Sequence, residues 1–174
     1  MRSLIALVLL GSAVLAEPSS VTNGFRPAEE RTPAPGFALA SETNTTVSLS
    51  RYKGRVVLLD FWATWCTGCK VEIPWYQEFQ KKYARRGLTS IGVAMDEEGW
   101  AIVAPYLDAH PVSYPIVLGD SDVADRYAVA ALPVTLLIDR NGKVAARHYG
   151  VVDKAGLDSE IRKLLKERPK PPKK

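Results

Sequence analysis

The sequence predicts an α/β fold in which helices cover both faces of a mixed sheet. Three observations predict it. Two continuous apolar runs, VVLLDFW and LTSIGVAM, have the composition of strands buried on both faces. Each run is followed by a segment with apolar residues at helical spacing, as in parallel strands joined by helices. Asn141-Gly142 then favours a tight turn between two antiparallel strands.

The first 35 residues are expected to lie outside the folded domain. Residues 1–16 hold one basic residue, an apolar run and small residues, the pattern of a secretory signal peptide that is either cleaved or retained as a membrane anchor. Residues 17–35 are rich in Pro, Ser, Thr and Glu and predict a flexible linker. The domain is expected over residues 36–168, with a basic tail over 169–174.

The domain is expected to open with a β-hairpin, PGFALAS and TTVSLS around a polar turn. A buried strand over RVVLLDFW and a helix over residues 67–86 follow, and Gly87 ends the helix. Next come the strand LTSIGVAM, a helix within EEGWAIVAPYLDAH and the strand SYPIVL. A short helix over 122–127, the strands LPVTLLID and VAARHY, and a helix over 153–167 complete the expected order.

The net charge of +4 is unevenly distributed along the chain. From Arg162 to Lys174 there are seven basic residues and one acidic residue. Without this tail and the basic residue near the N-terminus, the chain has 15 basic and 18 acidic residues. We therefore expect no nucleic-acid partner, and expect the tail to serve solubility or weak attraction to anionic surfaces.

The only two cysteines lie three positions apart in WCTGCK, where the first long strand gives way to a helix. A chain of 174 residues can bury a core without disulfides, so this short loop points to chemistry. Free N–H groups and the helix dipole should lower the pKa of Cys66, making it the nucleophile. Cys69 would resolve the mixed disulfide. A zinc site, a quiet disulfide and unreactive core thiols are the alternatives; zinc is disfavoured because only His110 and His148 could supply nitrogen ligands.

Two acids lie near the cysteines in the sequence. Asp60 interrupts VVLLDFW, where burying a carboxylate costs several kcal/mol unless it is paired or protonated. It is expected to transfer protons or to make a structural hydrogen bond. Glu72 follows Cys69 by three residues, so it either shares a helix face with this cysteine or lies exposed near the favourable helix dipole.

WCTGCK after a buried strand, the LPVT segment and the following hairpin resemble the thioredoxin fold. The APGFALAS opening, FWATWC through VEIP, and the helix and strand between Asp96 and Leu118 resemble the TlpA/ResA-like branch of secreted thiol-disulfide oxidoreductases. This resemblance covers residues 33–165. It implies a thioredoxin fold with an N-terminal β-hairpin and a central helix-strand insertion. It also implies exchange through the CxxC pair, with no cofactor beyond a redox-active Cys66-Cys69 disulfide.

The resemblance also implies roles for individual residues. Asp60 stands where thioredoxins have a buried Asp that helps to remove the proton of the resolving thiol, although TlpA/ResA-like chains often have Asn there. Glu72 matches an acid that tunes the cysteine pair. Leu132-Pro133 is expected to be a cis peptide bond opposite the cysteines, with backbone groups free to pair with an extended substrate segment.

The expected substrate-binding residues are Trp65, Thr67, Gly68, Leu132 and Pro133. Trp65 would border the sulfur as an apolar platform, whereas Trp62 is expected in the core. Gly68 stands where the family usually has Pro. His148 is expected to be a strand-end residue and not a catalyst.

The resemblance implies a periplasmic or otherwise extracytoplasmic reductant of protein disulfides, for instance in cytochrome c maturation or oxidase assembly. It implies a membrane electron donor and, once the signal peptide is cleaved, no stable membrane insertion. A disulfide-forming oxidase and a Cu(I) carrier using the two thiols are the alternatives. A peroxiredoxin-type peroxidase is disfavoured because a leucine and Ala63 occupy the Pro and Thr places of a PxxxTxxC pattern.

Overall fold

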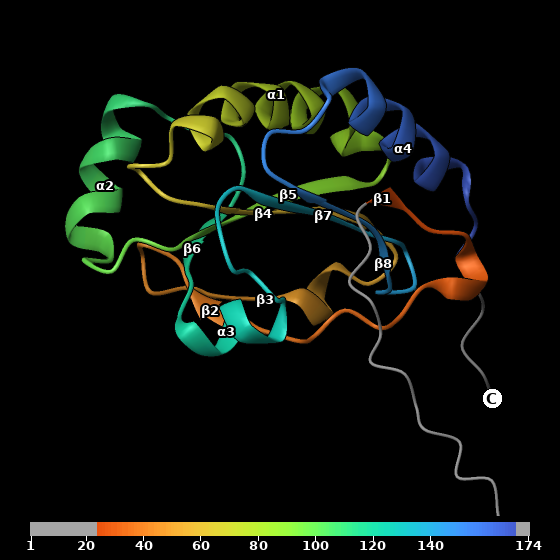
Figure 1. Cartoon of the computed structure of the whole chain (residues 1–174), viewed down its shortest axis with the longest axis horizontal. Coiled ribbons are helices and arrows are strands. Elements are labelled where there is room, and N and C mark those ends of the chain that lie inside the picture. Colours follow the sequence, from red (N-terminus) through yellow and green to blue (C-terminus); the bar gives the residue numbers. More distant parts are fainter. Residues whose placement is uncertain (1–23, 170–174) are drawn as a thin grey trace, which may run out of the picture.

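The computed structural model describes residues 24–169, which form a six-stranded mixed sheet and a separate two-stranded hairpin (Figure 1). The order in the large sheet is β1-β8-β7-β4-β5-β6. Strands β4, β5 and β6 are parallel. β7 runs antiparallel to β4, β8 runs antiparallel to β7, and β1 runs antiparallel to β8. The strands are β1 (Gly24–Phe25), β2 (Ala38–Ala40), β3 (Thr46–Ser48), β4 (Val56–Trp62), β5 (Leu88–Ala94), β6 (Ile116–Leu118), β7 (Val134–Ile138) and β8 (Val144–Tyr149).

Helices and the hairpin cover the two faces of this sheet (Figure 1). Helices α1 and α4 lie on one face, whereas the β2–β3 hairpin and α3 lie on the other, and α2 lies toward the β6 edge. The helices are α1 (Thr67–Tyr83), α2 (Trp100–Ala109), α3 (Ser121–Arg126) and α4 (Lys154–Lys166), with short 3-10 helices η1 (Ala28–Glu30), η2 (Leu49–Tyr52) and η3 (Ala84–Arg86). The predicted α/β architecture, the hairpin and the central α2–β6 insertion are confirmed.

Every residue of β4 is buried, which explains why its sequence is a continuous apolar run. Because side chains alternate along a strand, its residues divide between two cores. Leu58 and Trp62 pack with α1 and α4, whereas Leu59 and Phe61 pack with the hairpin and α3. Asp60 lies between Leu58 and Trp62 in the same alternation. It therefore faces α1, the helix that carries the cysteines.

The predicted flexible linker over 17–35 differs from the structure over residues 24–35. Gly24–Phe25 forms β1 at the edge of the sheet, paired with β8. Arg31 is almost fully buried, and Pro33 forms an isolated bridge with Lys143. The polar composition of this segment predicts a linker. The prediction fails because Arg31 and Pro33 contact residues more than 100 positions away, which the composition cannot show. Residues 17–23, the predicted signal peptide and residues 170–174 of the tail lie outside the described residues.

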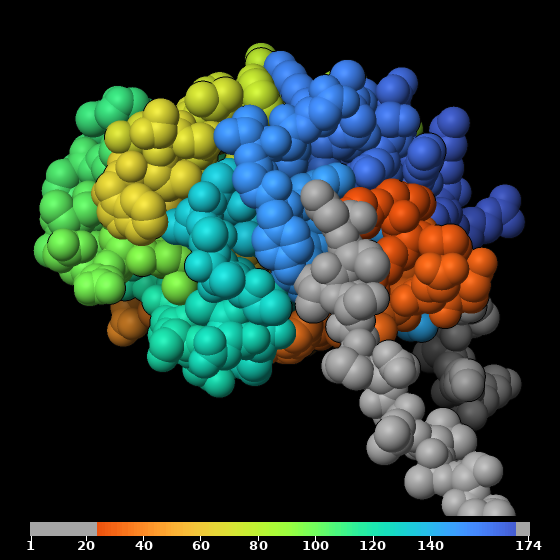
Figure 2. Space-filling view, in the orientation of Figure 1, coloured from red at the N-terminus to blue at the C-terminus, as the bar shows by residue number. Residues whose placement is uncertain are grey.

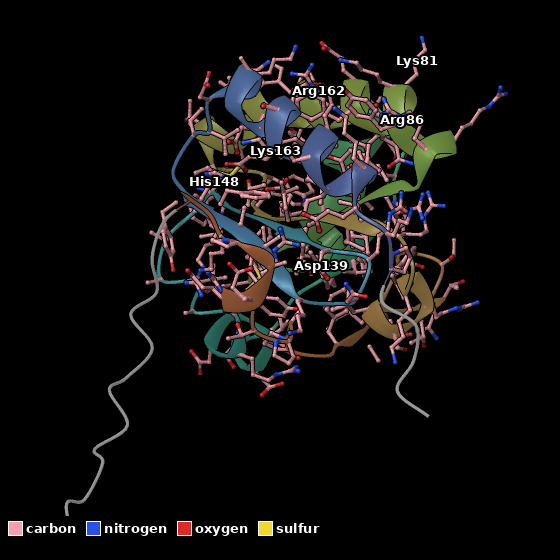
Figure 3. All side chains as sticks on the ribbon, turned by 90° about the vertical axis from the view of Figure 1, so that its right-hand side faces the viewer. Lys81, Arg86, Asp139, His148, Arg162 and Lys163 are labelled. Atoms are coloured by element: carbon pink, nitrogen blue, oxygen red, sulfur yellow. A yellow bond between two sulfur atoms is a disulfide. The ribbon has the colours of Figure 1, made fainter. Side chains whose placement is uncertain are left out.

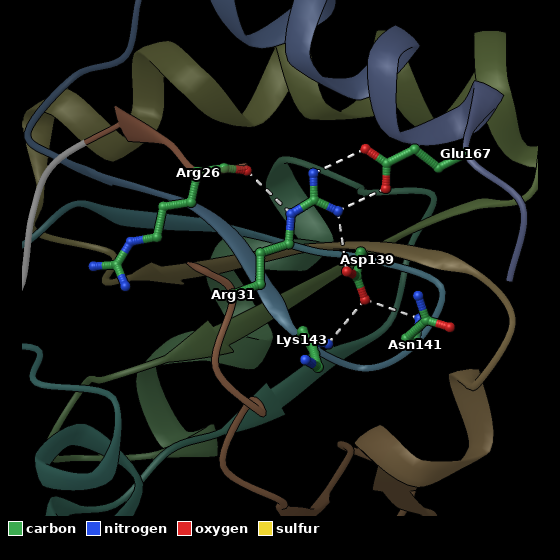
Figure 4. A network of polar contacts seen from close by, with 6 residues as sticks. All are labelled: Arg26, Arg31, Asp139, Asn141, Lys143 and Glu167. Carbon is green, nitrogen blue, oxygen red and sulfur yellow. Dashed lines mark hydrogen bonds and ion pairs between the residues drawn. The ribbon is translucent and has the colours of Figure 1, made fainter. Parts of the chain in front are cut away.

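Arg31 joins three distant parts of the chain (Figure 4). Its guanidinium donates to Asp139 after β7 at 3.1 Å, and to both carboxylate oxygens of Glu167 after α4 at 2.6 and 2.8 Å. The other oxygen of Asp139 accepts the backbone N–H groups of Asn141 and Lys143 in the β7–β8 turn. Fixing the segment before the hairpin in this way also fixes β1 against β8.

Basic side chains gather in the layer formed by α1, η3 and α4 (Figure 3). This layer contains Lys81, Arg86, Arg162 and Lys163. The Nζ atom of Lys163 also lies 5.3 Å from the centre of the Phe25 ring.

None of the helices within residues 24–169 is long and apolar enough to cross a membrane.

Candidate active site

Cys66 and Cys69 form a disulfide where the buried strand β4 gives way to α1. Cys66 is the N-cap of α1, and its Sγ accepts the backbone N–H of Cys69 at 3.2 Å. The N–H groups of a first helical turn have no partner within the helix, so a sulfur anion here meets donors and the positive end of the helix dipole. Cys66 is 5% exposed and Cys69 fully buried, so Cys66 is the sulfur that a partner can reach.

The loop before Cys66 is held by Asp96, a residue that the sequence analysis did not single out. Its carboxylate accepts the backbone N–H of Thr64 through both oxygens at 3.1 Å, and the Thr64 hydroxyl at 2.6 Å. Asp96 follows β5, the parallel neighbour of β4. The carboxyl ends of parallel strands meet at one edge of a sheet, and this rule could have identified Asp96. It fixes the approach to the reactive sulfur.

Asp60 is fully buried, and neither of its carboxyl oxygens has a hydrogen-bond partner within residues 24–169. Burial raises its pKa well above the ordinary range, and the neighbouring Glu72 raises it further. The structure therefore lends no support to the alternative role, a structural hydrogen bond. Asp60 therefore has the environment of a carboxyl that holds its proton tightly.

Glu72 is fully buried, so the alternative of an exposed helical Glu is wrong. It lies three residues after Cys69 on α1, and both point into the core. Its Oε1 accepts the backbone N–H of Val152 at 2.7 Å. Burial raises the pKa of Glu72, while the Val152 N–H, Tyr76 and His148 oppose that rise. The sequence could not show this burial because it depends on the loop after β8.

Tyr76 and Thr135 complete the buried polar cluster. Thr135 lies directly opposite Asp60 in the β4–β7 pair, so both side chains are on the α1 side of the sheet. The Thr135 hydroxyl lies 2.7 Å from the Tyr76 hydroxyl, and Tyr76 follows Glu72 by one helical turn. Burial raises the pKa of Tyr76 well above its ordinary value, with Asp60 and Glu72 adding to the rise, so this phenol stays protonated. The bridge joins β7, the neighbour of the strand carrying Asp60, to the helix carrying Glu72.

The residues predicted to bind substrate lie around the disulfide. Trp65 is 66% exposed immediately before Cys66, and Thr67 is the exposed first residue of α1. Leu132-Pro133 is a cis peptide bond, as predicted, and the Pro133 ring lies next to Gly68. Val151, 52% exposed, also lies against Gly68 and was not predicted. Figure 2 shows the yellow segment of the cysteines adjoining the light blue loop after β8.

Two further expectations concern aromatic and imidazole side chains. Trp62 is 1% exposed and packs with α1, so its predicted place in the core is confirmed. His148 lies near the end of β8, as predicted, where its Nε2 is 2.8 Å from Glu160 of α4. Within residues 24–169, no group of three or more His, Cys, Asp or Glu side chains is arranged to hold a metal ion.

Comparison with known proteins matches this arrangement to a family. Residues 31–147 match the AhpC/TSA family. The thiol-disulfide oxidoreductase ResA of Bacillus subtilis is 35% identical over 144 residues, which cover 82% of this chain and 80% of that protein. This chain belongs to the ResA-like thiol-disulfide oxidoreductases of the AhpC/TSA family. The predicted TlpA/ResA-like resemblance is thereby confirmed.

Solved structures agree with the ResA-like assignment. A crystal structure described as a thiol:disulfide interchange protein DsbE of Chlorobium tepidum superposes with a TM-score of 0.74 at 34% identity, covering 84% of this chain and 99% of that one. A DsbF homologue of Corynebacterium diphtheriae, at 23% identity and a TM-score of 0.75, shares the fold. The ResA-like chain is therefore a thiol-disulfide oxidoreductase with a thioredoxin fold, acting on thiols and disulfides through its CxxC pair.

Proposed function

We propose that this protein reduces disulfides of exported proteins, with Cys66 as the attacking sulfur and Cys69 as the resolving one. The observation that carries this assignment is the position of Cys66 Sγ at the start of α1, where it accepts the Cys69 N–H at 3.2 Å. Donors at a helix start favour the thiolate, which is the reactive form. Cys69 is fully buried behind it and suits an intramolecular second step.

The exchange has two steps. The Cys66 thiolate attacks one sulfur of the partner's disulfide, and the other partner sulfur leaves as a thiolate. Cys69 then gives its proton to the Asp60 carboxylate and attacks Cys66 Sγ, which releases the second partner thiolate. Two electrons have passed to the partner, and the Cys66–Cys69 disulfide has formed. An electron-donating dithiol reduces this disulfide by the reverse chemistry, with Asp60 returning the proton to Cys69.

The raised pKa of Asp60 suits it to this proton transfer. An ordinary Asp is far more acidic than a thiol, whose pKa is about 8.5, and would accept its proton poorly. Burial of Asp60 brings the two proton affinities closer, which is the condition for efficient general base catalysis. We assign Glu72 the role of tuning the pair, because it is buried one turn from Cys69 and raises the pKa of Asp60.

The partner is expected to dock beside the disulfide as an extended segment. Trp65 offers an exposed apolar face, and Thr67 and Gly68 form the turn between the cysteines. Pro133, in the cis Leu132-Pro133 pair before β7, borders this turn, with its ring next to Gly68. These five residues form the proposed docking surface for partner thiols and disulfides.

The proposed place of action is the periplasm or another extracytoplasmic compartment, supported by the signal-like pattern of residues 1–16. There the protein would receive electrons from a membrane donor and pass them to exported proteins, for instance during cytochrome c maturation or oxidase assembly. Because such compartments favour disulfides, a reductant in them needs a continuous electron supply. No further cofactor is proposed beyond the cysteine pair.

The decisive experiment combines trapping with electrochemistry. Cys69→Ser is expected to accumulate mixed disulfides through Cys66, whereas Cys66→Ser should accumulate none; the opposite pattern would reverse the two roles. The reduction potential is expected below about −200 mV, as for reductants, whereas a value near about −120 mV would identify a disulfide-forming oxidase. Stoichiometric Cu(I) binding without disulfide reductase activity would point to the copper carrier.

A further inference from the structure

The loop from Gly150 to Val152 is attached at three consecutive residues to three parts of the active site. The Gly150 N–H donates to the Pro133 carbonyl at 2.9 Å. Val151 packs against Gly68, in the turn between the cysteines. The Val152 N–H donates to Glu72 Oε1 at 2.7 Å. A displacement of this loop therefore reaches the proline segment, the cysteine turn and the buried acid together.

Gly68 is what lets the loop come so close. A Cβ atom at position 68 would lie 2.8 Å from Val151 Cγ2 and 3.4 Å from Pro133 Cδ. The first distance is shorter than van der Waals contact allows, and the proline ring on the other side cannot rotate away. Any side chain at 68 must therefore displace Val151, and we expect the short loop that carries it to move outward with it.

The Val152 N–H is the contact through which such a displacement would act on chemistry. Glu72 is fully buried, and a backbone N–H favours its charged form over its protonated form. A hydrogen bond to a buried charged group typically changes an equilibrium by tenfold or more. Losing this bond would raise the proton affinity of Glu72.

Several other titratable groups face Glu72. Asp60 from β4, Tyr76 from α1 and Tyr114 interact with it electrostatically. His148 from β8 favours the charged form of Glu72 and is itself paired with Glu160 of α4. Only the Val152 N–H belongs to the loop that touches the cysteine turn. A change at Gly68 can therefore reach Glu72 through this loop as well as along α1, which carries both residues.

We propose that Val151 is a positioning residue: by resting on Gly68 it holds the Val152 N–H on Glu72, and so ties the turn between the cysteines to the charge of the buried acid. The function of this link rests on the proposed roles of Cys66, Cys69 and Asp60, but the link itself is independent of them. Glycine at position 68 is then a requirement of the loop contact, and the proline common in related proteins would break it.

The test is a carboxyl NMR titration of the reduced protein with Gly68→Ala, Val151→Ala and the double variant. Gly68→Ala is expected to raise the midpoint of Glu72 by about one pH unit, the equivalent of a tenfold loss of hydrogen-bond stabilisation. Val151→Ala alone removes the methyl groups that rest on Gly68 and should also raise the midpoint, as Val151→Gly should. In the double variant the new methyl group at position 68 occupies the vacated space, so the midpoint should return to within about 0.3 units of wild type. An unchanged midpoint in Gly68→Ala, or a double variant shifted as far as the single one, would overturn the proposal.

A second experiment, in Glu72→Gln protein, distinguishes loss of the Val152–Glu72 contact from general loosening of the fold. In Glu72→Gln protein, Gly68→Ala should leave the pH profile of disulfide exchange unchanged, whereas in wild-type Glu72 protein it should displace the profile. Equal displacement in both backgrounds would also contradict the proposal. If the proposed function were wrong, the wild-type protein itself would show no disulfide exchange. Should Gly68→Ala not fold, Val151→Gly tests the same bond from the loop side, with an upward shift of the Glu72 midpoint expected and an unchanged midpoint counting against the link.

Discussion

Thr135 lies directly opposite Asp60 in the sheet, yet its hydroxyl bonds Tyr76, and the Asp60 carboxyl has no hydrogen-bond partner among residues 24–169. A threonine in this position could have satisfied the buried acid. The Thr135 hydroxyl is engaged by Tyr76 at 2.7 Å, a contact that joins α1 to the sheet. Burial and the neighbouring Glu72 raise the pKa of Asp60. This environment is the one that the proposed proton transfer between Asp60 and Cys69 requires.

Asp60→Asn is expected to slow release of the partner more than the initial attack by Cys66, because release requires Cys69 to lose its proton before it attacks. Loss of a general base typically reduces the rate of its step by about 10²-fold or more. Stopped-flow measurement of mixed-disulfide formation and decay separates the two steps. Asp108→Asn makes the same chemical change on an exposed helix and should leave both rates unaltered. Equal slowing of both steps in Asp60→Asn would argue against proton transfer.

The same substitution is expected to change how stability depends on pH. The pKa of Asp60 is raised in the folded state, so the folded protein binds more protons than the unfolded chain between the two pKa values. The contribution of Asp60 to stability is therefore greatest below about pH 4 and is lost as the pH rises through its folded pKa. Asp60→Asn should flatten this fall and add roughly 1–3 kcal/mol at neutral pH. Urea unfolding at a series of pH values measures both, and parallel curves would contradict the expectation.

Trp65→Ala is expected to lower kcat/KM for a protein disulfide by roughly tenfold, because an exposed aromatic anchor of an interface contributes about 1–2 kcal/mol. A small disulfide reagent should react nearly as fast as with wild type, since it does not cover this face. The melting temperature should change little because Trp65 is two-thirds exposed. Trp65→Phe keeps an aromatic face and serves as the conservative control. Equal losses for both substrates would place Trp65 outside the docking surface.

Arg31→Ala is expected to destabilise the fold by roughly 3 kcal/mol, because it leaves the buried Asp139 carboxylate without its cation. Glu167→Gln, which alters the more exposed partner, should have a smaller effect. Guanidinium unfolding monitored by tryptophan fluorescence gives both values. A loss below about 0.5 kcal/mol for Arg31→Ala would mean that the N-terminal segment is held by other contacts.

The elements near the disulfide could be predicted because their signals are local. An apolar run followed by helical spacing identifies the β4–α1 junction, and a sulfur in the first helical turn meets free N–H groups in any such junction. Asp60 could be singled out because burying a charged residue inside an apolar run is energetically costly. Residues 24–35 could not be placed, because their order depends on Arg31 meeting Asp139 and Glu167 across more than 100 residues.

The amino-acid sequence alone determined the α/β class, the order of strands and helices after residue 36, and the place of the two cysteines at a strand–helix junction, because periodicity and helix starts act over a few neighbouring residues. Only the tertiary structure decided that Glu72 is buried, that Asp96 holds the loop before Cys66, and that Val151 rests on Gly68. Each of these contacts joins residues from different strands, helices or loops. Burial and proton affinity depend on such neighbours, and sheet packing brings them together irrespective of their distance along the chain.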